Sequence, residues 1–354
     1  MPERFDRRKL LRGVAAGIIP TLVGVDVLRA LQTAPLHEPG LEAVFPSDLV
    51  RELSTPFFIE DPHTGQKINV LFLNRKQLEI GKPLLITSNG FPGLLESASS
   101  IRNAGWEAYN TPLPFLVFEA PGIGNSDPLT RDQIMASRRG EFLDEVARAI
   151  GRAVRRFNLP VPNVHNPRKT TRYASRHKGQ EIRVEKANMV GNSMAASLVS
   201  VLLSQAGEVG LEVEIGGEVE AVGVAPFTEP ELTDRFVESG GVDPDVVWLG
   251  KLYLAWTVRN FPQQYIRAFA DQFVPEALDT ALTNKNLKKL IVGYAENSLL
   301  DPKRYVLPMI EDLSNKHPGK VISHEFKEDD HEIFNRSANH PYSWSSFLQQ
   351  HFLK

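Results

Sequence analysis

Residues 187–196 read Ala-Asn-Met-Val-Gly-Asn-Ser-Met-Ala-Ala, an apolar run that leads through a Gly-x-Ser-x-Ala motif into small residues. The pattern predicts a strand, a sharp turn at Ser193 and a helix. In such a turn the serine has a strained backbone, and its flanking positions must be small because their Cβ atoms crowd each other. Gly191 and Ala195 meet that requirement. We therefore predict that Ser193 is a nucleophile at a strand-to-helix turn.

Strand-like and helix-like segments alternate from Pro56 onward, which predicts an α/β fold: a mostly parallel sheet with helices on both faces. The expected strands are 57–59 and 68–73, which form an opening hairpin, and then 84–87, 115–118, 189–190, 219–224, 290–292 and 321–323. The clearest predicted helix spans 131–157, and a C-terminal helix is expected to end near Phe352.

The length of 354 residues suits one large domain with an insertion. We expect a signal-like or anchor segment at 1–34 and an α/β domain at 35–354, with a helical cap at 227–286. The cap contains two aromatic stripes at helical spacing: Trp248, Leu252 and Trp256, and then Tyr265, Phe269 and Phe273. Such stripes usually form a helix–helix core, and the alternative is that part of them roofs an apolar substrate pocket.

The N-terminus carries a basic stretch, DRRKLLR at residues 6–12, followed by an apolar stretch rich in Gly and Ala at 13–25. This arrangement resembles a twin-arginine export signal, and the apolar run is too short to span a bilayer as a helix. Asp26 and Arg29 follow at once, and no good small-x-small cleavage site is present. Export or attachment to the cell envelope is the favoured expectation, and a surface helix of a cytoplasmic protein is the alternative.

Composition excludes several classes of function. A net charge of -3 gives no electrostatic case for binding nucleic acid. The absence of cysteine excludes disulfides, thiolate catalysis and cysteine-ligated metals. The segment 160–179 has five basic and no acidic residues, which indicates a solvated insertion or a binding site for an anionic surface or substrate.

Two turns rich in glycine follow predicted strands, at 88–93 and at 121–126. A turn at the carboxyl end of a parallel strand can point main-chain N–H groups into the crevice where ligands bind. We assign one oxyanion donor to the main-chain N–H of Phe91. The other is the N–H of Met194, at the start of the helix after the serine.

In this order, the turn at 89–93, the turn at 121–126 and the motif at 191–195 resemble the α/β-hydrolase family. The resemblance extends from about Pro56 to the C-terminus. It implies the α/β-hydrolase fold, a chain order of serine, acid and histidine, and no cofactor or metal. The Gly-Asn-Ser-Met string also resembles the corresponding turn of carbon–carbon bond hydrolases that act on ring-cleavage products.

A serine hydroxyl needs an imidazole to take its proton, and the imidazole needs a carboxylate to orient it. His331 follows the last predicted strand, where the resemblance places the histidine, whereas His324 lies within that strand and is expected to be a packed or surface residue. For the acid we favour Glu296, three residues after Gly293. The alternative acid is Asp301, which also suits the N-cap of the next helix.

The sequence therefore predicts a serine hydrolase that cleaves a carboxylic ester or related acyl substrate of apolar character through an acyl-enzyme. The alternatives are a carbon–carbon bond or amide hydrolase with the same triad, and a catalytically silent binding protein of the same fold.

Overall fold

The computed structural model describes residues 41–79, 82–88, 95, 98–159, 179–225, 227–238, 262–272, 274–298, 300, 302–327 and 342–353. All of them belong to the unit Leu41–Lys354. The segment expected at 1–34 and nearly all of the basic insertion at 160–179 lie outside the described residues.

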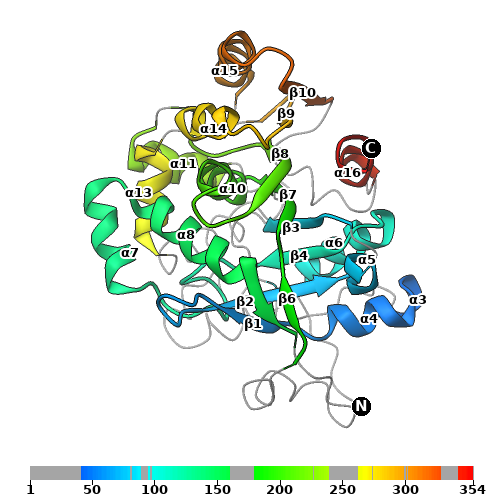
Figure 1. The fold of residues 1–354 in the computed structure, drawn as a ribbon. Coiled ribbons are helices and arrows are strands. Elements are labelled where there is room, and N and C mark those ends of the chain that lie inside the picture. Colours follow the sequence, from blue (N-terminus) through cyan, green and yellow to red (C-terminus); the bar gives the residue numbers. More distant parts are fainter. Residues whose placement is uncertain are drawn as a thin grey trace, which may run out of the picture. The chain divides into compact units, whose positions relative to one another are not determined.

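An eight-stranded sheet forms the centre of the fold, in the order β1-β2-β4-β3-β7-β8-β9-β10 (Figure 1). The strands are β1 (Phe57–Glu60), β2 (Lys67–Leu73), β3 (Leu84–Ser88), β4 (Phe115–Phe118), β7 (Lys186–Asn192), β8 (Glu212–Val219), β9 (Lys289–Ala295) and β10 (Val321–Phe326). β1 and β2 form the expected antiparallel hairpin, and β2 also runs antiparallel to β4. The pairs from β4 through β3 to β10 are all parallel, which confirms the predicted mostly parallel α/β fold.

The strand predicted at 219–224 is wrong, because β8 spans Glu212–Val219 and the chain leaves the sheet at Glu220. Residues 221–224 are buried and apolar, but they form a turn in which Gly223 has a φ of 105°. The apolar run at 221–224 therefore reflects burial in a turn and not a strand. β8 itself was not predicted, because its glutamates interrupt the apolar pattern of a buried strand.

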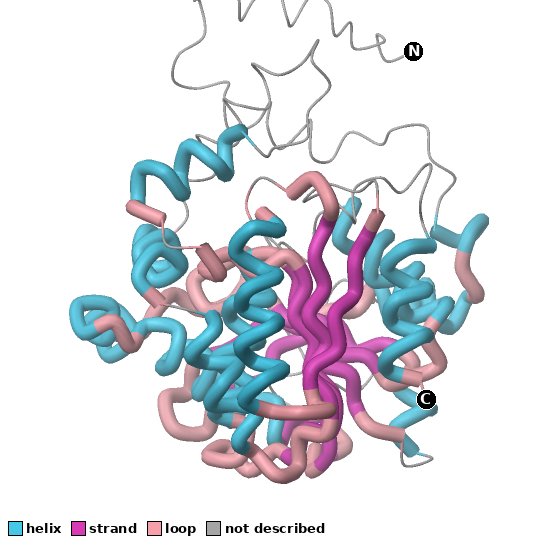
Figure 2. Tube along the Cα trace, turned by 90° about the horizontal axis from the view of Figure 1, so that it is seen from above, coloured by secondary structure: helices cyan, strands magenta, loops and turns pink. Residues whose placement is uncertain are grey.

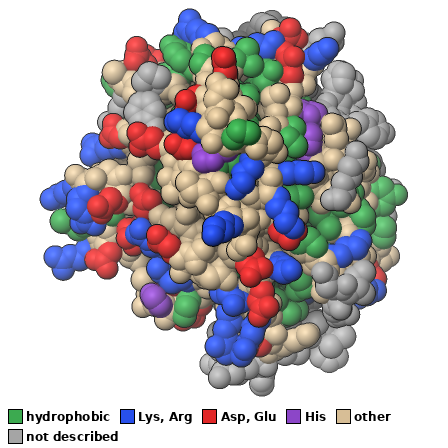
Figure 3. Space-filling model, turned by 45° about the horizontal axis from the view of Figure 1, so that its top comes forward, with side chains coloured by type: hydrophobic (Ala, Val, Ile, Leu, Met, Phe, Trp, Pro, Cys, Tyr) green, Lys and Arg blue, Asp and Glu red, His purple; other side chains and the backbone are tan. Residues whose placement is uncertain are grey.

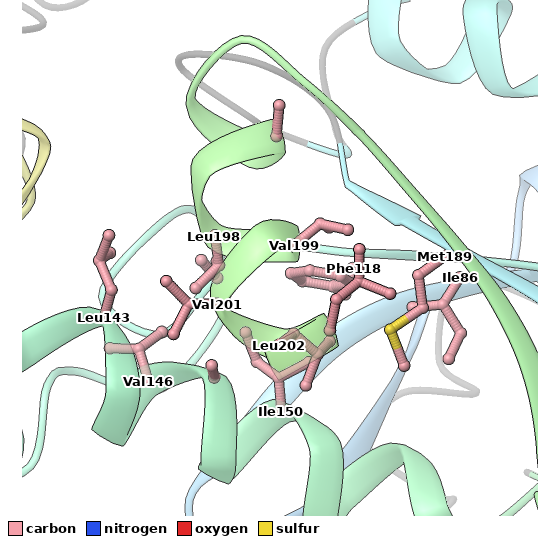
Figure 4. Packing of buried hydrophobic residues seen from close by; sticks show 14 of the residues in the cluster. Ile86, Phe118, Leu143, Val146, Ile150, Met189, Leu198, Val199, Val201 and Leu202 are labelled. Carbon is pink, nitrogen blue, oxygen red and sulfur yellow. The ribbon is translucent and has the colours of Figure 1, made fainter. Parts of the chain in front are cut away.

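Helices cover both faces of the sheet (Figure 2). One face carries α8 (Phe142–Arg155), α10 (Met194–Gln205), α14 (Val274–Thr283) and α15 (Lys303–Lys316). The other face carries α4 (Ser47–Leu53), α6 (Ala98–Asn110) and α16 (Tyr342–Phe352), the last of which confirms the expected C-terminal helix. Figure 4 shows packing on the first of these faces, where Val146 and Ile150 of α8 lie next to Val201 and Leu202 of α10.

The helix predicted at 131–157 is wrong as one continuous helix. α7 (Arg131–Ala136) begins with a capping box between Thr130 and Gln133 and runs into the 3₁₀ turn η1 (Ser137–Arg139). Gly140 then adopts a φ of 73°, which no helix continues through, and α8 begins afterwards. α8 ends at Arg155, where a short antiparallel ribbon of β5 (Arg156–Asn158) and β6 (Glu181–Arg183) begins.

The remaining helices are short. α3 (Leu41–Val44) and α5 (Arg75–Glu79) flank the N-terminal part of the sheet, and α11 (Glu229–Glu238) and α13 (Gln263–Asp271) lie within the span expected to form the cap. On α13, Tyr265 and Phe269 are buried, and the Tyr265 hydroxyl donates to the main-chain oxygen of Pro121 at 2.8 Å. These two aromatic residues are therefore core, as such stripes usually are. Trp248, Leu252, Trp256 and Phe273 lie outside the described residues.

Basic and acidic side chains are interspersed on the face shown in Figure 3. Within the described residues, no helix combines the length and the apolar character that crossing a membrane requires.

Candidate active site

Ser193 lies between the end of β7 and the start of α10, in the backbone conformation predicted for a nucleophile turn. Its φ of 56° and ψ of -126° are unusual for a residue with a side chain, and such strain is typical of functional sites. The main-chain N–H of Ser193 donates to the oxygen of Val219 at 2.9 Å, which ties the turn to β8. Only 6% of Ser193 is exposed, so a substrate must come close to the sheet edge to reach it.

The tightness of this turn explains the small residues around Ser193. A Cβ at Gly191 would lie 2.6 Å from the Cα of Ala196, far inside the distance that real contacts allow. α10 packs directly back onto the end of β7, and Ala195 and Ala196 are buried in that contact. The motif is therefore required by backbone crowding at the turn, as the sequence predicts.

The first turn of α10 supplies the expected donors. Met194 is its first residue, and the N–H groups at a helix N-terminus have no partner within the helix. Their aligned dipoles favour negative charge beside Ser193. Phe91, the other expected donor, lies outside the described residues.

The buried carboxylate of Glu119, directly after β4, holds the neighbouring turns together. It accepts hydrogen bonds from the main-chain N–H of Leu95 at 2.6 Å, the N–H of Asn125 at 2.8 Å and the side-chain amide of Asn69 at 2.8 Å. Leu95 follows the turn at 89–93, and Asn125 lies in the turn at 121–126. One carboxylate thus links both glycine-rich turns to β2, a role that the sequence did not indicate.

Glu296 follows β9 directly, two strands along the sheet from β7. Because β7, β8 and β9 are parallel, Ser193 and Glu296 lie at the same carboxyl edge. The Glu296 N–H donates to the oxygen of Phe326 at 3.1 Å, its side chain is exposed, and its negative charge is one of the causes that raise the pKa of Lys303. The main cause there is the ion pair between Lys303 and Glu325.

The other two expected members of the triad region, Asp301 and His331, lie outside the described residues. α15 begins at Lys303 with Pro302 as its N-cap, so the N-cap role expected for Asp301 belongs to Pro302. His324 lies on β10, as expected, and is a packed residue. Its ring lies 4.6 Å from that of Phe326, its Nδ1 is 3.1 Å from Nε2 of His351, and burial lowers its pKa.

Sequence reasoning missed two glutamates at the end of β8. Glu218 and Glu220 are both fully buried, and a side-chain oxygen of Glu220 accepts a hydrogen bond from the N–H of Ala295. Burial, together with the negative charge of Glu220, raises the pKa of Glu218 to about 8. In the sequence, Glu218 directly precedes the strand expected at 219–224 and Glu220 lies within it. Two acidic residues next to buried apolar positions are the signal that could have indicated them.

A cavity of about 290 Å³ lies at the opposite edge of the sheet, lined by residues that include Arg51, Asn74, Arg75 and Tyr109. It adjoins the end of β2, where Leu73 pairs with Phe115 at the start of β4. The cavity is therefore at the amino ends of the parallel strands, away from Ser193. Within the described residues, no group of three or more His, Asp or Glu side chains is arranged to hold a metal ion.

Comparisons of the sequence find no matching family model and no matching curated protein. Comparisons of the structure do find similar folds. The esterase Pf2001 of Pyrococcus furiosus is 11% identical with a TM-score of 0.51, over 87% of this chain and 93% of that one. The 2-hydroxy-6-oxo-6-phenylhexa-2,4-dienoate hydrolase of Rhodococcus sp. strain RHA1 is 15% identical with a TM-score of 0.50, over 85% and 100%. At these identities the likeness concerns the fold.

Proposed function

We propose that this chain, which has the α/β-hydrolase fold, is a serine hydrolase that cleaves a carboxylic ester or related acyl substrate of apolar character. The observation that carries the proposal is Ser193, a strained and nearly buried serine at the strand-to-helix turn, beside the N-terminus of α10. A φ of 56° is strained for a residue with a side chain, and strain of this kind concentrates at functional sites.

In the proposed reaction, the Ser193 hydroxyl attacks the substrate carbonyl while His331 takes its proton. Glu296 orients the imidazole, with Asp301 as the alternative acid, and the N–H groups of Phe91 and Met194 stabilise the oxyanion. His331 then returns the proton to the leaving alcohol, and an acyl-enzyme remains on Ser193. Water, activated by the same imidazole, hydrolyses this intermediate and restores the serine.

A carbon–carbon bond hydrolase is the second candidate, because the turn at Ser193 reads Gly-Asn-Ser-Met. The fold alone does not distinguish the two, since one fold supports many reactions. Both reactions use the same serine chemistry at the turn. A panel of p-nitrophenyl esters and of vinylogous 1,5-diketones therefore distinguishes the two functions, because each enzyme turns over only its own substrate class.

The test is covalent labelling by a fluorophosphonate, which reacts with activated serines. The unchanged protein should label at one site, and Ser193→Ala should abolish labelling and esterase activity while the fold remains. Ser200→Ala is the matched control, because Ser200 is also buried on α10 and its hydroxyl donates to the main-chain oxygen of Ala196 at 2.8 Å. Full labelling of Ser193→Ala would refute the proposed nucleophile. A protein that never labels would favour the binding-protein alternative.

A further inference from the structure

Two strained residues lie side by side at the carboxyl edge of the sheet. Among the described residues, the non-glycine residues with positive φ are Asn74, Ser193 and Glu220, at 52°, 56° and 54°. Ser193 follows β7 directly, and Glu220 follows the neighbouring strand β8 directly. Strain of this kind persists only where surrounding contacts enforce it, and it concentrates at functional sites. The contacts that hold Glu220 in this conformation are therefore of functional interest, as they are for Ser193.

The contacts of Glu220 and of Val219 before it connect β7, which precedes Ser193, to β9, which precedes Glu296. Its own N–H donates to the oxygen of Gly293 at 3.0 Å, and its carboxylate accepts from the N–H of Ala295. On its other side, the Val219 oxygen accepts from the N–H of Ser193 at 2.9 Å. A continuous series of hydrogen bonds thus runs from the serine turn through β8 to the residue before Glu296.

The side chain of Glu220 is the unusual member of this series, because the other bonds join main-chain atoms. Within a parallel sheet the strands usually bond each other through the backbone, but at the end of β9 the N–H of Ala295 is held by a carboxylate instead. Glu220 is fully buried, so the bond is shielded from water and is correspondingly strong and costly to lose.

We propose that Glu220 is a positioning residue for the hydrolase reaction: by holding the N–H of Ala295, it fixes the main chain from which Glu296 projects and so the orientation of the imidazole relative to Ser193. This inference rests on the proposed function, in which Glu296 is the acid. Glu220 acts on the reaction through Glu296 and the backbone, without contact with the substrate.

Three variants distinguish the effect of the hydrogen bond to Ala295 from the effect of the carboxyl group's chemistry and from general damage to the fold. Glu220→Gly removes the acceptor, yet glycine adopts a φ of 54° without strain, so the backbone can be retained. Glu220→Gln keeps one oxygen acceptor for Ala295 and exchanges the other carboxyl oxygen for an NH2 group. Glu218→Gln is the matched control, because Glu218 is a buried glutamate on β8, two residues before Glu220, and burial raises its pKa to about 8.

The measurements are kcat and KM on p-nitrophenyl butyrate at pH 7, with the rate of fluorophosphonate labelling. In Glu220→Gly we expect kcat and the labelling rate to fall about 10- to 100-fold with KM nearly unchanged, because a small displacement of an orienting group costs rates of this order. Glu220→Gln and Glu218→Gln should stay within about threefold of the unchanged protein. If Glu220→Gly does not fold, Glu220→Asp replaces it, since its shorter carboxylate keeps the charge and withdraws from Ala295.

A double-mutant cycle decides whether Glu220 acts through Glu296. Glu220→Gly should cost nothing further in a Glu296→Gln background, because the group it positions is already lost. The inference is overturned if the losses of kcat in the two single variants multiply in the double variant. It is also overturned if Glu220→Gln is as inactive as Glu220→Gly, or if Glu296→Gln is fully active. Activity retained by Ser193→Ala would instead overturn the proposed function, so the two failures are distinguishable.

Discussion

Replacing Glu107 by glutamine should remove a loss of stability that the protein undergoes as the solution becomes mildly alkaline. Glu107 lies on α6 and is buried, and one of its carboxyl oxygens accepts a hydrogen bond from Nε1 of Trp344 on α16 at 2.6 Å. Burial raises the pKa of Glu107 from 4.5 to about 8, although the bond from Trp344 acts in the opposite direction. The folded protein therefore keeps a proton on Glu107 over a pH range in which the unfolded chain has released it.

The sign of the effect follows from this difference. A carboxyl that binds its proton more tightly in the folded state stabilises the fold fully below pH 4.5, and the contribution disappears as the pH rises to about 8. The full interval corresponds to about 5 kcal/mol in the free energy of unfolding, a large share of the stability of an ordinary domain. Between pH 6 and pH 8 the expected loss from this group is about 2 kcal/mol, because the folded group is still half protonated at pH 8.

Urea unfolding followed by far-ultraviolet circular dichroism, at pH 6, 7 and 8, measures this loss. Glutamine has the same shape, keeps an oxygen for Trp344 and cannot ionise, so the stability of Glu107→Gln relative to the unchanged protein should rise by about 2 kcal/mol from pH 6 to pH 8. Glu311→Gln, an exposed change on α15, is the control and should follow the unchanged protein. Parallel curves for Glu107→Gln and the unchanged protein would refute the reasoning, because a neutral buried carboxyl requires them to diverge.

Glu296→Gln should lower kcat by up to about four orders of magnitude if it is the triad acid, whereas Asp301→Asn should leave kcat within about tenfold; the reverse order would assign the acid to Asp301. Tyr265→Phe should lower the free energy of unfolding by about 1–3 kcal/mol in urea, because it leaves a buried main-chain oxygen of the turn after β4 without its hydroxyl donor; an unchanged midpoint would contradict that bond. Changing Arg7 and Arg8 to lysine should block export of the protein in a bacterial host with a twin-arginine system, as judged by fractionation, and unchanged export would exclude that signal.

The features that the sequence determined by itself are those that depend on neighbours along the chain. The turn at Ser193 is one, since the crowding of Gly191 against Ala196 arises within six residues. The hairpin of β1 and β2 and the continuous apolar runs of β3 and β4 are others, because burial on both faces leaves a direct trace in composition. The break in the helix predicted at 131–157 is also a local feature, because it arises at Gly140, whose positive φ ends a helix.

Tertiary structure decided what depends on contacts between distant segments. The acceptor for the N–H of Ala295 comes from Glu220, 75 residues earlier in the chain, and nothing near either residue indicates the pairing. The same holds for Glu119, whose carboxylate joins two turns and β2. A glutamate in a sequence is normally an exposed residue, and only the sheet order, with β8 between β7 and β9, carries Glu218 and Glu220 into the interior. Their burial changes the pKa of one and gives the other its role, because desolvation and hydrogen bonding depend on what surrounds a group in space rather than along the chain.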